Sequence, residues 1–185
     1  MKRLISLIFI IGSICVFASA QQGREKLDKI QQSLKDDVPN VLCVDERVAT
    51  GGQPKDDAFS KLAANGYRAV LSLRTASEGI DLKQEQEAVE KAGMRFVNVP
   101  VVSRAPKPED VDEFIKAVKN KDNHPMLIHC GSANRVGAFW MIYRVVEQGW
   151  TEEKALEEAI KIGLTSPVLK SFAHEYIASR KKVQG

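Results

Sequence analysis

The feature that most constrains this chain is an apolar run that ends in a cysteine and is followed by a small-residue loop, an arginine and a long apolar helix. The run 125–129 leads into Cys130, and Arg135 comes just before the helix. Between them lie four loop residues, Gly131, Ser132, Ala133 and Asn134. Small residues allow successive backbone N–H groups to face one point, and the following helix directs its positive N-terminal end there. The segment therefore predicts an oxyanion site.

Two side chains of this segment are candidates for chemistry. Arg135 can contact two oxygens of a phosphate-like group through paired, charge-assisted hydrogen bonds. A cysteine in such a positive field loses its proton below the value of roughly 8.5 that a free thiol has. We therefore predict that Cys130 is a thiolate nucleophile. The alternative is that Cys130 is only a small apolar residue at a strand end.

The motif His129-Cys130, followed by a loop and Arg135, resembles the signature of cysteine-dependent protein tyrosine and dual-specificity phosphatases. Those enzymes place five residues between Cys and Arg and usually a Ser or Thr after the Arg, whereas this chain has four residues and Val136. The shorter spacing is similar to two other groups. One is the bacterial phosphatase-like domain found with beta-lactamase-like hydrolases and NAD kinases, and the other is rhodanese, which handles sulfur.

The resemblance extends over residues 41–165 and implies roles for further residues. The backbone amides of 131–135 would bind the phosphate oxygens, and His129 would orient Cys130 from behind the loop. Arg74 ends the predicted strand 68–74, so it is either a substrate-binding wall of the site or a surface salt-bridge partner. Gln53, in a Gly-Gln-Pro turn like one in the family, is interpreted as a turn residue.

The general acid is hard to place. Tyrosine phosphatases carry it as an aspartate in the loop that here corresponds to residues 102–107, which contain no carboxylate. Asp110 is the candidate, although an acid in a first helical turn is also expected for the helix dipole alone. Glu85, Glu87 and Glu90 are interpreted as a solvated helix face.

The N-terminus predicts export. Residues 1–20 combine a short basic start, an apolar stretch and an Ala-x-Ala site, which is typical of a secretory signal peptide. The apolar stretch is shorter than the roughly 20 residues of a spanning helix, so no stable membrane insertion is expected after cleavage. We expect a periplasmic or secreted protein with an N-terminal arm or helix at 21–40 and a phosphatase-like domain at 41–182. In an oxidising compartment, Cys43 and Cys130 could pair.

Composition limits the possible partners. The net charge of the 185-residue chain is +3, and it falls to about +1 once Lys2 and Arg3 are removed, which argues against nucleic-acid binding. The three histidines are scattered, so we expect no metal and no cofactor. Alternating strand and helix patterns predict an α/β fold with a mostly parallel sheet covered by helices on both faces.

The leading functional hypothesis is an exported, metal-independent hydrolase of phosphomonoesters. Phosphotyrosine is one candidate group, and the phosphorylated substrate is a protein or a small molecule. It would act through a phosphocysteine on Cys130. Two alternatives remain open at this point. The first is rhodanese-like sulfur transfer through a persulfide on Cys130. The second is a module that binds phosphate or another anion without catalysis.

Overall fold

The computed structural model describes residues 21–183, so the predicted signal peptide at 1–20 lies outside the described part. One five-stranded sheet has the order β1-β2-β5-β3-β4. Its strands are β1 (Leu42–Asp45), β2 (Val48–Gly51), β3 (Ala69–Ser72), β4 (Arg95–Asn98) and β5 (Met126–His129). Only β1 runs antiparallel to its neighbour, while β2, β5, β3 and β4 are parallel. The prediction of a mostly parallel sheet is confirmed.

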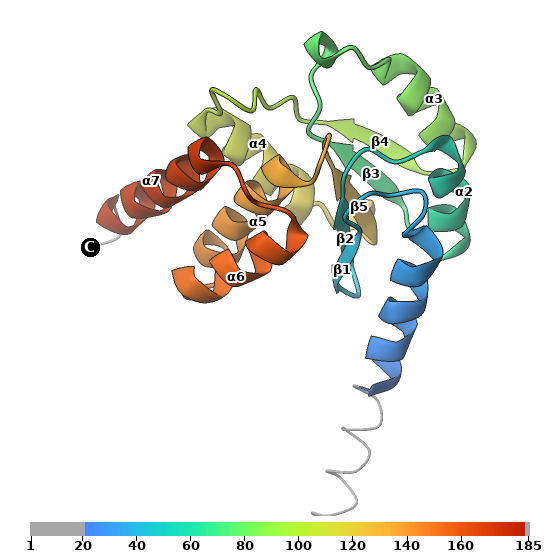
Figure 1. The fold of residues 1–185 in the computed structure, drawn as a ribbon, viewed down its shortest axis with the longest axis horizontal. Coiled ribbons are helices and arrows are strands. Elements are labelled where there is room, and N and C mark those ends of the chain that lie inside the picture. The colour runs from blue at the N-terminus through green and yellow to red at the C-terminus, as the bar shows by residue number, and fades with distance from the viewer. Residues whose placement is uncertain (1–20, 184–185) are drawn as a thin grey trace, which may run out of the picture.

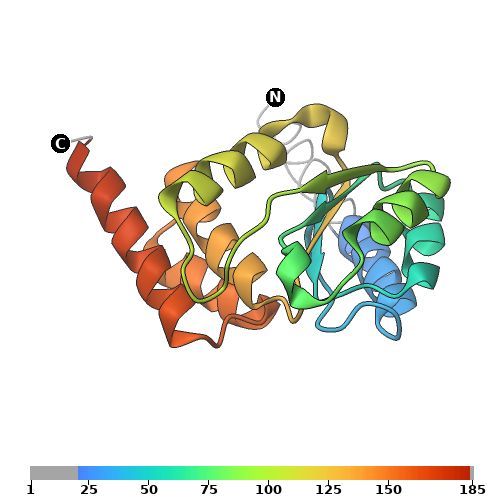
Figure 2. The same cartoon turned by 90° about the horizontal axis from the view of Figure 1, so that it is seen from above.

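Helices cover both faces of the sheet, as predicted (Figures 1 and 2). One face carries a helix over residues 21–34 together with α2 (Asp56–Ala64) and α3 (Leu82–Lys91). The other carries α4 (Pro108–Lys119), α5 (Asn134–Val146), α6 (Glu152–Ile162) and α7 (Pro167–Val183). Two single 3₁₀ turns, η1 (Ala76–Glu78) and η2 (Lys121–Asn123), lie in the connections.

Local sequence signals account for where several helices begin. The Asp81 carboxylate accepts hydrogen bonds from the N–H groups of Lys83 and Gln84, which satisfies two free donors at the start of α3. The Thr151 hydroxyl accepts from Lys154 N–H at the start of α6 in the same way. Pro108 occupies the first turn of α4, where a missing N–H costs no hydrogen bond.

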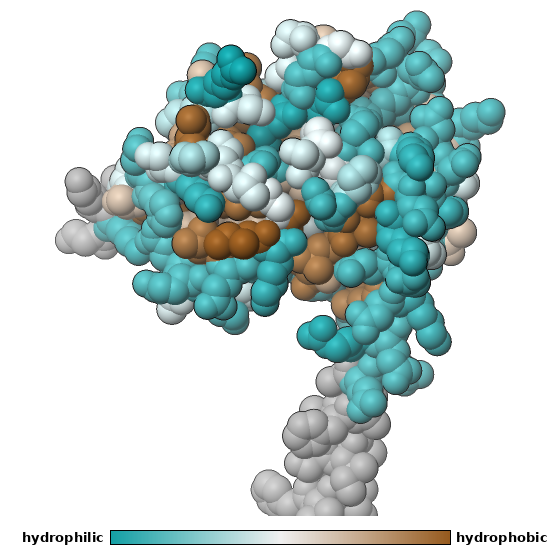
Figure 3. Space-filling view, viewed as in Figure 1, coloured by the Kyte–Doolittle hydropathy of each residue, from teal (hydrophilic) through white to brown (hydrophobic). Residues whose placement is uncertain are grey.

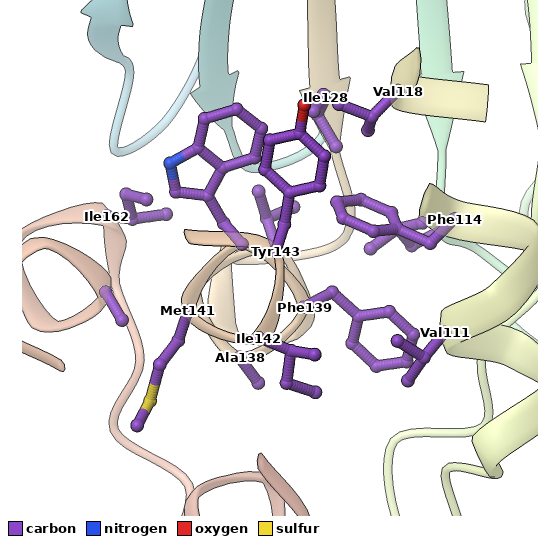
Figure 4. Packing of buried hydrophobic residues seen from close by; sticks show 14 of the residues in the cluster. Val111, Phe114, Val118, Ile128, Ala138, Phe139, Met141, Ile142, Tyr143 and Ile162 are labelled. Carbon is purple, nitrogen blue, oxygen red and sulfur yellow. The ribbon is translucent and has the colours of Figure 1, made fainter. Parts of the chain in front are cut away.

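The sheet separates two cores of unequal size. The larger core surrounds α5, whose residues from Arg135 to Arg144 are all buried. Figure 4 looks along this helix and shows Phe139 directed toward Phe114 and Val111 of α4. The Phe114 and Phe139 rings meet edge to face with centroids 5.5 Å apart. Cys130, just before the loop of interest, belongs to this core, and Arg135, just after the loop, is buried at the start of α5.

The smaller core lies under the N-terminal helix. Ile30 and Leu34 of this helix and Val38 just after it are buried against residues of α2, β3 and β5. Residues 21–40 thus contribute to the packing of the sheet. No helix within residues 21–183 is both long enough and apolar enough to cross a bilayer. Figure 3 shows that hydrophilic side chains dominate the face seen in Figure 1, with separate apolar areas between them.

The four parallel strands end at one edge of the sheet. Gly51, Ser72, Asn98 and His129 are their last residues, and Gly51 and Ser72 both pair with His129 across β5. The loops that follow these strands therefore meet beside the central strand. Open α/β sheets bind their ligands at this carboxyl edge, and the Cys130 segment begins there.

Candidate active site

Successive side chains of β5 point to opposite faces of the sheet, and this alternation continues through His129 and Cys130. Met126 and Ile128 belong to the large core and Leu127 to the small one. The next residue, His129, accordingly lies on the side of α3, and Cys130 joins the large core beside α5. Both side chains are fully buried. His129 thus lies behind the loop, where the phosphatase resemblance places it.

The loop after Cys130 is fixed by the turn after β2. Cys130 N–H donates to Gly51 O at 3.3 Å, and Gln53 N–H donates to Gly131 O at 3.1 Å. Ala133 has a φ of 65°, in the left-handed region, and this residue turns the chain into α5. The N–H groups of Gly131, Ser132 and Arg135 donate no hydrogen bond among residues 21–183. Gly131 and Ser132 are exposed, so the loop presents free N–H donors at its surface.

Asn134 anchors the loop to the connection between α6 and α7. Its Oδ1 accepts from the N–H groups of Thr165 and Ser166 at 2.9 and 2.8 Å, and its Nδ2 donates to Thr165 Oγ1 at 2.8 Å. The side-chain amide is therefore occupied by structure. If Asn134 binds substrate, as the sequence predicts, the backbone N–H is the group that remains for it.

The guanidinium of Arg135 is held from several sides. Nη1 donates to Leu73 O and Val101 O, both at 2.8 Å, and to Glu78 Oε1 at 2.6 Å. Nη2 donates to Glu78 Oε2 at 2.7 Å. Burial alone would lower the pKa of Arg135, but its contacts with Glu78 and Cys130 raise it. Arg135 is therefore a permanent cation beside the sulfur atom.

Glu78 is the counter-ion of this site and was not identified from the sequence. Besides Arg135, its carboxylate accepts hydrogen bonds from Thr75 N–H and lies 2.6 Å from Arg74 Nε. Burial alone would raise the pKa of Glu78, but the bonds from Arg135 and Thr75 and the charge of Arg74 lower it to about 2. Glu78 is consequently a carboxylate at every pH above the acid range.

The sequence allows Arg74 to line the site or to form a surface salt bridge. In the structure it lies at the mouth of the loop. A methyl group at Gly131 would be 3.7 Å from Arg74 Nη1 and 3.9 Å from Arg135 Nη2. Two guanidinium groups therefore approach the same loop residue. Arg74 Nη1 also donates to Gln53 Oε1 at 2.8 Å. Gln53, interpreted from the sequence as a turn residue, thus positions a cation of the site as well.

The prediction that Glu85 belongs to a solvated helix face is wrong. Its side chain is 7% exposed, and Oε1 lies 3.1 Å from His129 Nε2, close enough for an ionic contact although not aligned as a hydrogen bond. The same Oε1 accepts from Gln53 Nε2 at 2.7 Å. Burial alone would raise the pKa of Glu85, but His129, Gln53 and Arg74 lower it. Glu85 connects the residue before Cys130 to the Arg74 side of the site.

Asp110, the predicted general acid, caps a helix in this structure. Its Oδ2 accepts from Lys107 N–H at 2.9 Å at the start of α4, and its role as general acid stays a prediction.

Cys43 and Cys130 are both free thiols in this structure. Cys43 belongs to the small core and Cys130 to the large one, so the sheet lies between them. Among residues 21–183, no three His, Cys, Asp or Glu side chains gather as a metal site would require.

Comparisons with known proteins agree with this geometry. Residues 24–174 match the family described as DSP-PTPase phosphatase fused to NAD+ Kinase. Two curated relatives, the beta-lactamase hydrolase-like proteins of Xylella fastidiosa strains Temecula1 and 9a5c, are each 30% identical over 112 residues. The match covers 58% of this chain and 25% of each relative, so the chain spans about a quarter of their length.

Solved structures of low sequence identity share the fold. The DUF442 protein of Shewanella putrefaciens CN-32 has a TM-score of 0.67 at 24% identity, covering 78% of this chain and 92% of its own. The catalytic domain of the PP-IP phosphatase of S. cerevisiae has a TM-score of 0.66 at 19% identity, and the match covers 79% of this chain and 94% of that domain. TpbA of P. aeruginosa, solved in complex with pTyr, has a TM-score of 0.60 at 21% identity, and the match covers 75% of this chain and 82% of that chain.

Proposed function

Because the chain belongs to the family of DSP-PTPase phosphatases fused to NAD+ kinase, we propose that it hydrolyses phosphomonoesters through a phosphocysteine on Cys130. The observation that carries this proposal is the relation of Cys130 to Arg135. The cysteine ends β5, and the arginine, at the start of α5, is fixed beside it by Leu73 O, Val101 O and Glu78. A nucleophile and a fixed cation on one anion-binding loop suit phosphoryl transfer.

The proposed reaction has two steps. Cys130 Sγ attacks phosphorus, while Arg135 and the free N–H groups of the loop stabilise the negative charge on the non-bridging oxygens. The bond from phosphorus to the ester oxygen breaks, and the electron pair leaves with that oxygen. Water then attacks the phosphocysteine, which releases phosphate and regenerates the thiolate. Because Val136 has no hydroxyl to assist the departing sulfur, we expect the second step to be slow.

Phosphotyrosine is the first substrate to test. A phenol is a better leaving group than an aliphatic alcohol because it is far more acidic, with a pKa of about 10 for tyrosine. The similar fold of TpbA in complex with pTyr supports the choice without deciding it. The physiological substrate could be a phosphoprotein or a small phosphorylated molecule.

Export remains part of the proposal. It rests on the basic and apolar pattern of residues 1–20 and on the Ala-x-Ala site before Gln21. The full chain should be expressed in a bacterium and the periplasmic fraction analysed by intact mass. A mature form that begins at Gln21 would support export, and an uncleaved cytoplasmic form would contradict it.

The decisive experiment compares the reduced protein with Cys130→Ser on para-nitrophenyl phosphate and on a phosphotyrosine peptide. Turnover should vanish in the variant, and rapid quenching followed by intact mass should show a phosphate-sized adduct in the unmodified protein only. The adduct should be visible because slow hydrolysis lets the intermediate accumulate.

Other results of this experiment would distinguish sulfur transfer and non-catalytic anion binding from phosphate hydrolysis. A sulfur-sized adduct without turnover would point to persulfide chemistry on Cys130. Anion binding that is unchanged by Cys130→Ser and lost in Arg135→Ala, with no turnover, would identify a binding module. Turnover that survives Cys130→Ser would show that another residue is the nucleophile.

A further inference from the structure

The loop after β4 reaches the site but brings no proton donor to it. Val101 O accepts from Arg135 Nη1, so this connection begins beside the catalytic cation. Residues 99–107 contain no carboxyl, imidazole, phenol or thiol. Lys107, at their end, is exposed. A leaving group bound here meets no side chain of this loop that could protonate it near neutral pH.

Three carboxyl groups that could be considered as proton donors already have partners in the protein. The two oxygens of Glu78 contact Arg135 Nη1 and Nη2, and Arg74 Nε lies 2.6 Å from Oε2. Glu85 is buried against His129 and Gln53 on the opposite side of β5 from Cys130. Asp110 accepts from Lys107 N–H at the start of α4. Glu78 and Glu85 are thus held by cations and amides of the site, and Asp110 by the start of its own helix.

Two guanidinium groups, those of Arg135 and Arg74, share the single carboxylate of Glu78 at this site. Arg135 is the partner of the phosphoryl group that is transferred. Arg74 Nη1 would be 3.7 Å from a methyl group at the exposed Gly131, although the Arg74 side chain is itself only 11% exposed. A second guanidinium at the entrance can bind a second phosphate through charge-assisted hydrogen bonds.

We propose that the site acts on phosphate groups whose leaving group departs as a stable anion, and that its natural substrates are phosphoanhydrides. This inference rests on the phosphocysteine chemistry of the proposed function and extends its substrates from phosphomonoesters to phosphoanhydrides. Cys130 Sγ forms the bond to the terminal phosphorus as the bridging P–O bond breaks. The bridging oxygen keeps the electron pair and leaves as part of a phosphate anion beside Arg74, and no proton is needed for the step.

The first test measures how the rate depends on the acidity of the leaving group. The reduced protein is assayed with aryl phosphates from para-nitrophenyl phosphate to phenyl phosphate. An enzyme with a general acid gains on the order of 10²–10⁴ from it, mostly for poor leaving groups. We therefore expect kcat/KM to fall at least about 100-fold across the series. A nearly constant kcat/KM would overturn the inference and leave the phosphocysteine mechanism intact.

The second test asks whether Arg74 recognises a second phosphate. Arg74→Gln and the unmodified protein are compared on inorganic pyrophosphate, with a chelator present, and on para-nitrophenyl phosphate. Loss of one charge-assisted contact should lower kcat/KM for pyrophosphate about tenfold more than for the aryl ester. Equal losses on the two substrates, or no cleavage of pyrophosphate by the unmodified protein, would contradict the phosphoanhydride assignment.

A control separates this inference from the proposed function. Cys130→Ser must abolish turnover of both substrates if they share the nucleophile. Cleavage of pyrophosphate that survives in Cys130→Ser would count against the inference, because the anhydride would then be cut elsewhere. An absence of turnover of every aryl ester by the unmodified protein would overturn the proposed function, and the inference with it.

Discussion

Glu78 and Glu85 lie in the same stretch after β3, yet they serve the two sides of Cys130 in different ways. Glu78 is in front of the loop, is 27% exposed, and contacts the guanidinium groups of Arg135 and Arg74. Glu85 is behind the loop, is 7% exposed, and contacts His129 and Gln53. One carboxylate holds the cations that would touch substrate, and the other lies against the residue that precedes the proposed nucleophile.

The difference lies in how completely each carboxylate is satisfied. Charged or hydrogen-bonding groups of Thr75, Arg74 and Arg135 surround both oxygens of Glu78. Glu85 Oε2 and both ring nitrogens of His129 make no aligned hydrogen bond. Buried polar groups without such bonds are costly, so the back of the site is maintained by the packing around it. Both oxygens of Glu78 accept aligned hydrogen bonds, whereas only one oxygen of Glu85 does, and Arg74 Nε at the front also makes no aligned bond.

The largest effect is expected for Glu78→Gln. The amide keeps the shape of the side chain but cannot accept from both nitrogens of Arg135, so the guanidinium should lose its fixed orientation. We expect kcat/KM on an aryl phosphate to fall about 100-fold, mainly through kcat. Glu87→Gln, on the exposed face of α3, is the matched control and should be silent. A loss confined to KM would mean that Glu78 acts only on substrate binding.

Glu85→Gln should have a smaller effect. The substituted side chain can still accept from Gln53, but it loses the negative charge beside His129 Nε2. We expect kcat to fall about tenfold with KM nearly unchanged if His129 orients Cys130 and does not contact substrate. Steady-state kinetics beside Glu87→Gln would measure this. If kcat fell as far as in Glu78→Gln, the two carboxylates could not be assigned different roles on the two sides of Cys130.

The pH dependence of stability should distinguish the same two variants. The pKa of Glu78 is about 2 in the folded protein and 4.5 without its partners, so its contribution is fully present above 4.5 and is lost as the pH falls toward 2. The Tm difference between the unmodified protein and Glu78→Gln should therefore shrink over this window. The pKa of Glu85 is also lowered, so its difference should shrink in the same direction. A difference that grows on acidification would contradict both assignments.

The smallest effect is expected for Asp110→Asn. Asparagine can still accept from Lys107 N–H, so only the favourable charge at the start of α4 is lost, at a cost of about 0.3–1 kcal/mol. We expect kcat/KM for phenyl phosphate to change less than about twofold, whereas loss of a general acid costs on the order of 10²–10⁴. A loss in that larger range would establish Asp110 as the acid and would contradict the substrate class proposed above.

The sequence was sufficient to predict the sheet, the helices and the position of the loop. Periods of two and 3.6 residues identify strands and helices, and the alternation of β5 implies that His129 and Cys130 face opposite ways. The buried position of Glu85 could have been predicted from the same periodicity. It lies one helical turn before Val89, so it falls on the buried side of α3. The abundance of charged residues in that helix concealed the pattern.

Glu78 could not be found in this way. It follows no period, because it lies in a 3₁₀ turn within a loop. Its partner Arg135 is 57 residues further along the chain. Only the parallel pairing of β3 with β5, which ends in register at Ser72 and His129, brings the two loops together. Gln53 joins the site for the same reason, since β2 also ends beside His129. Contacts between loops depend on register, which the sequence of each loop does not encode.

The anchoring of Asn134 has a consequence for proteolysis. Its amide ties the phosphate-binding loop to Thr165 and Ser166, which connect α6 to α7. A cut in that connection would leave the sheet intact but would free the Asn134 side chain from the hydrogen bonds that hold it. A protease that cut the chain there should therefore loosen the loop without unfolding the sheet. Bound phosphate, by holding the same loop from the other side, should slow such a cut.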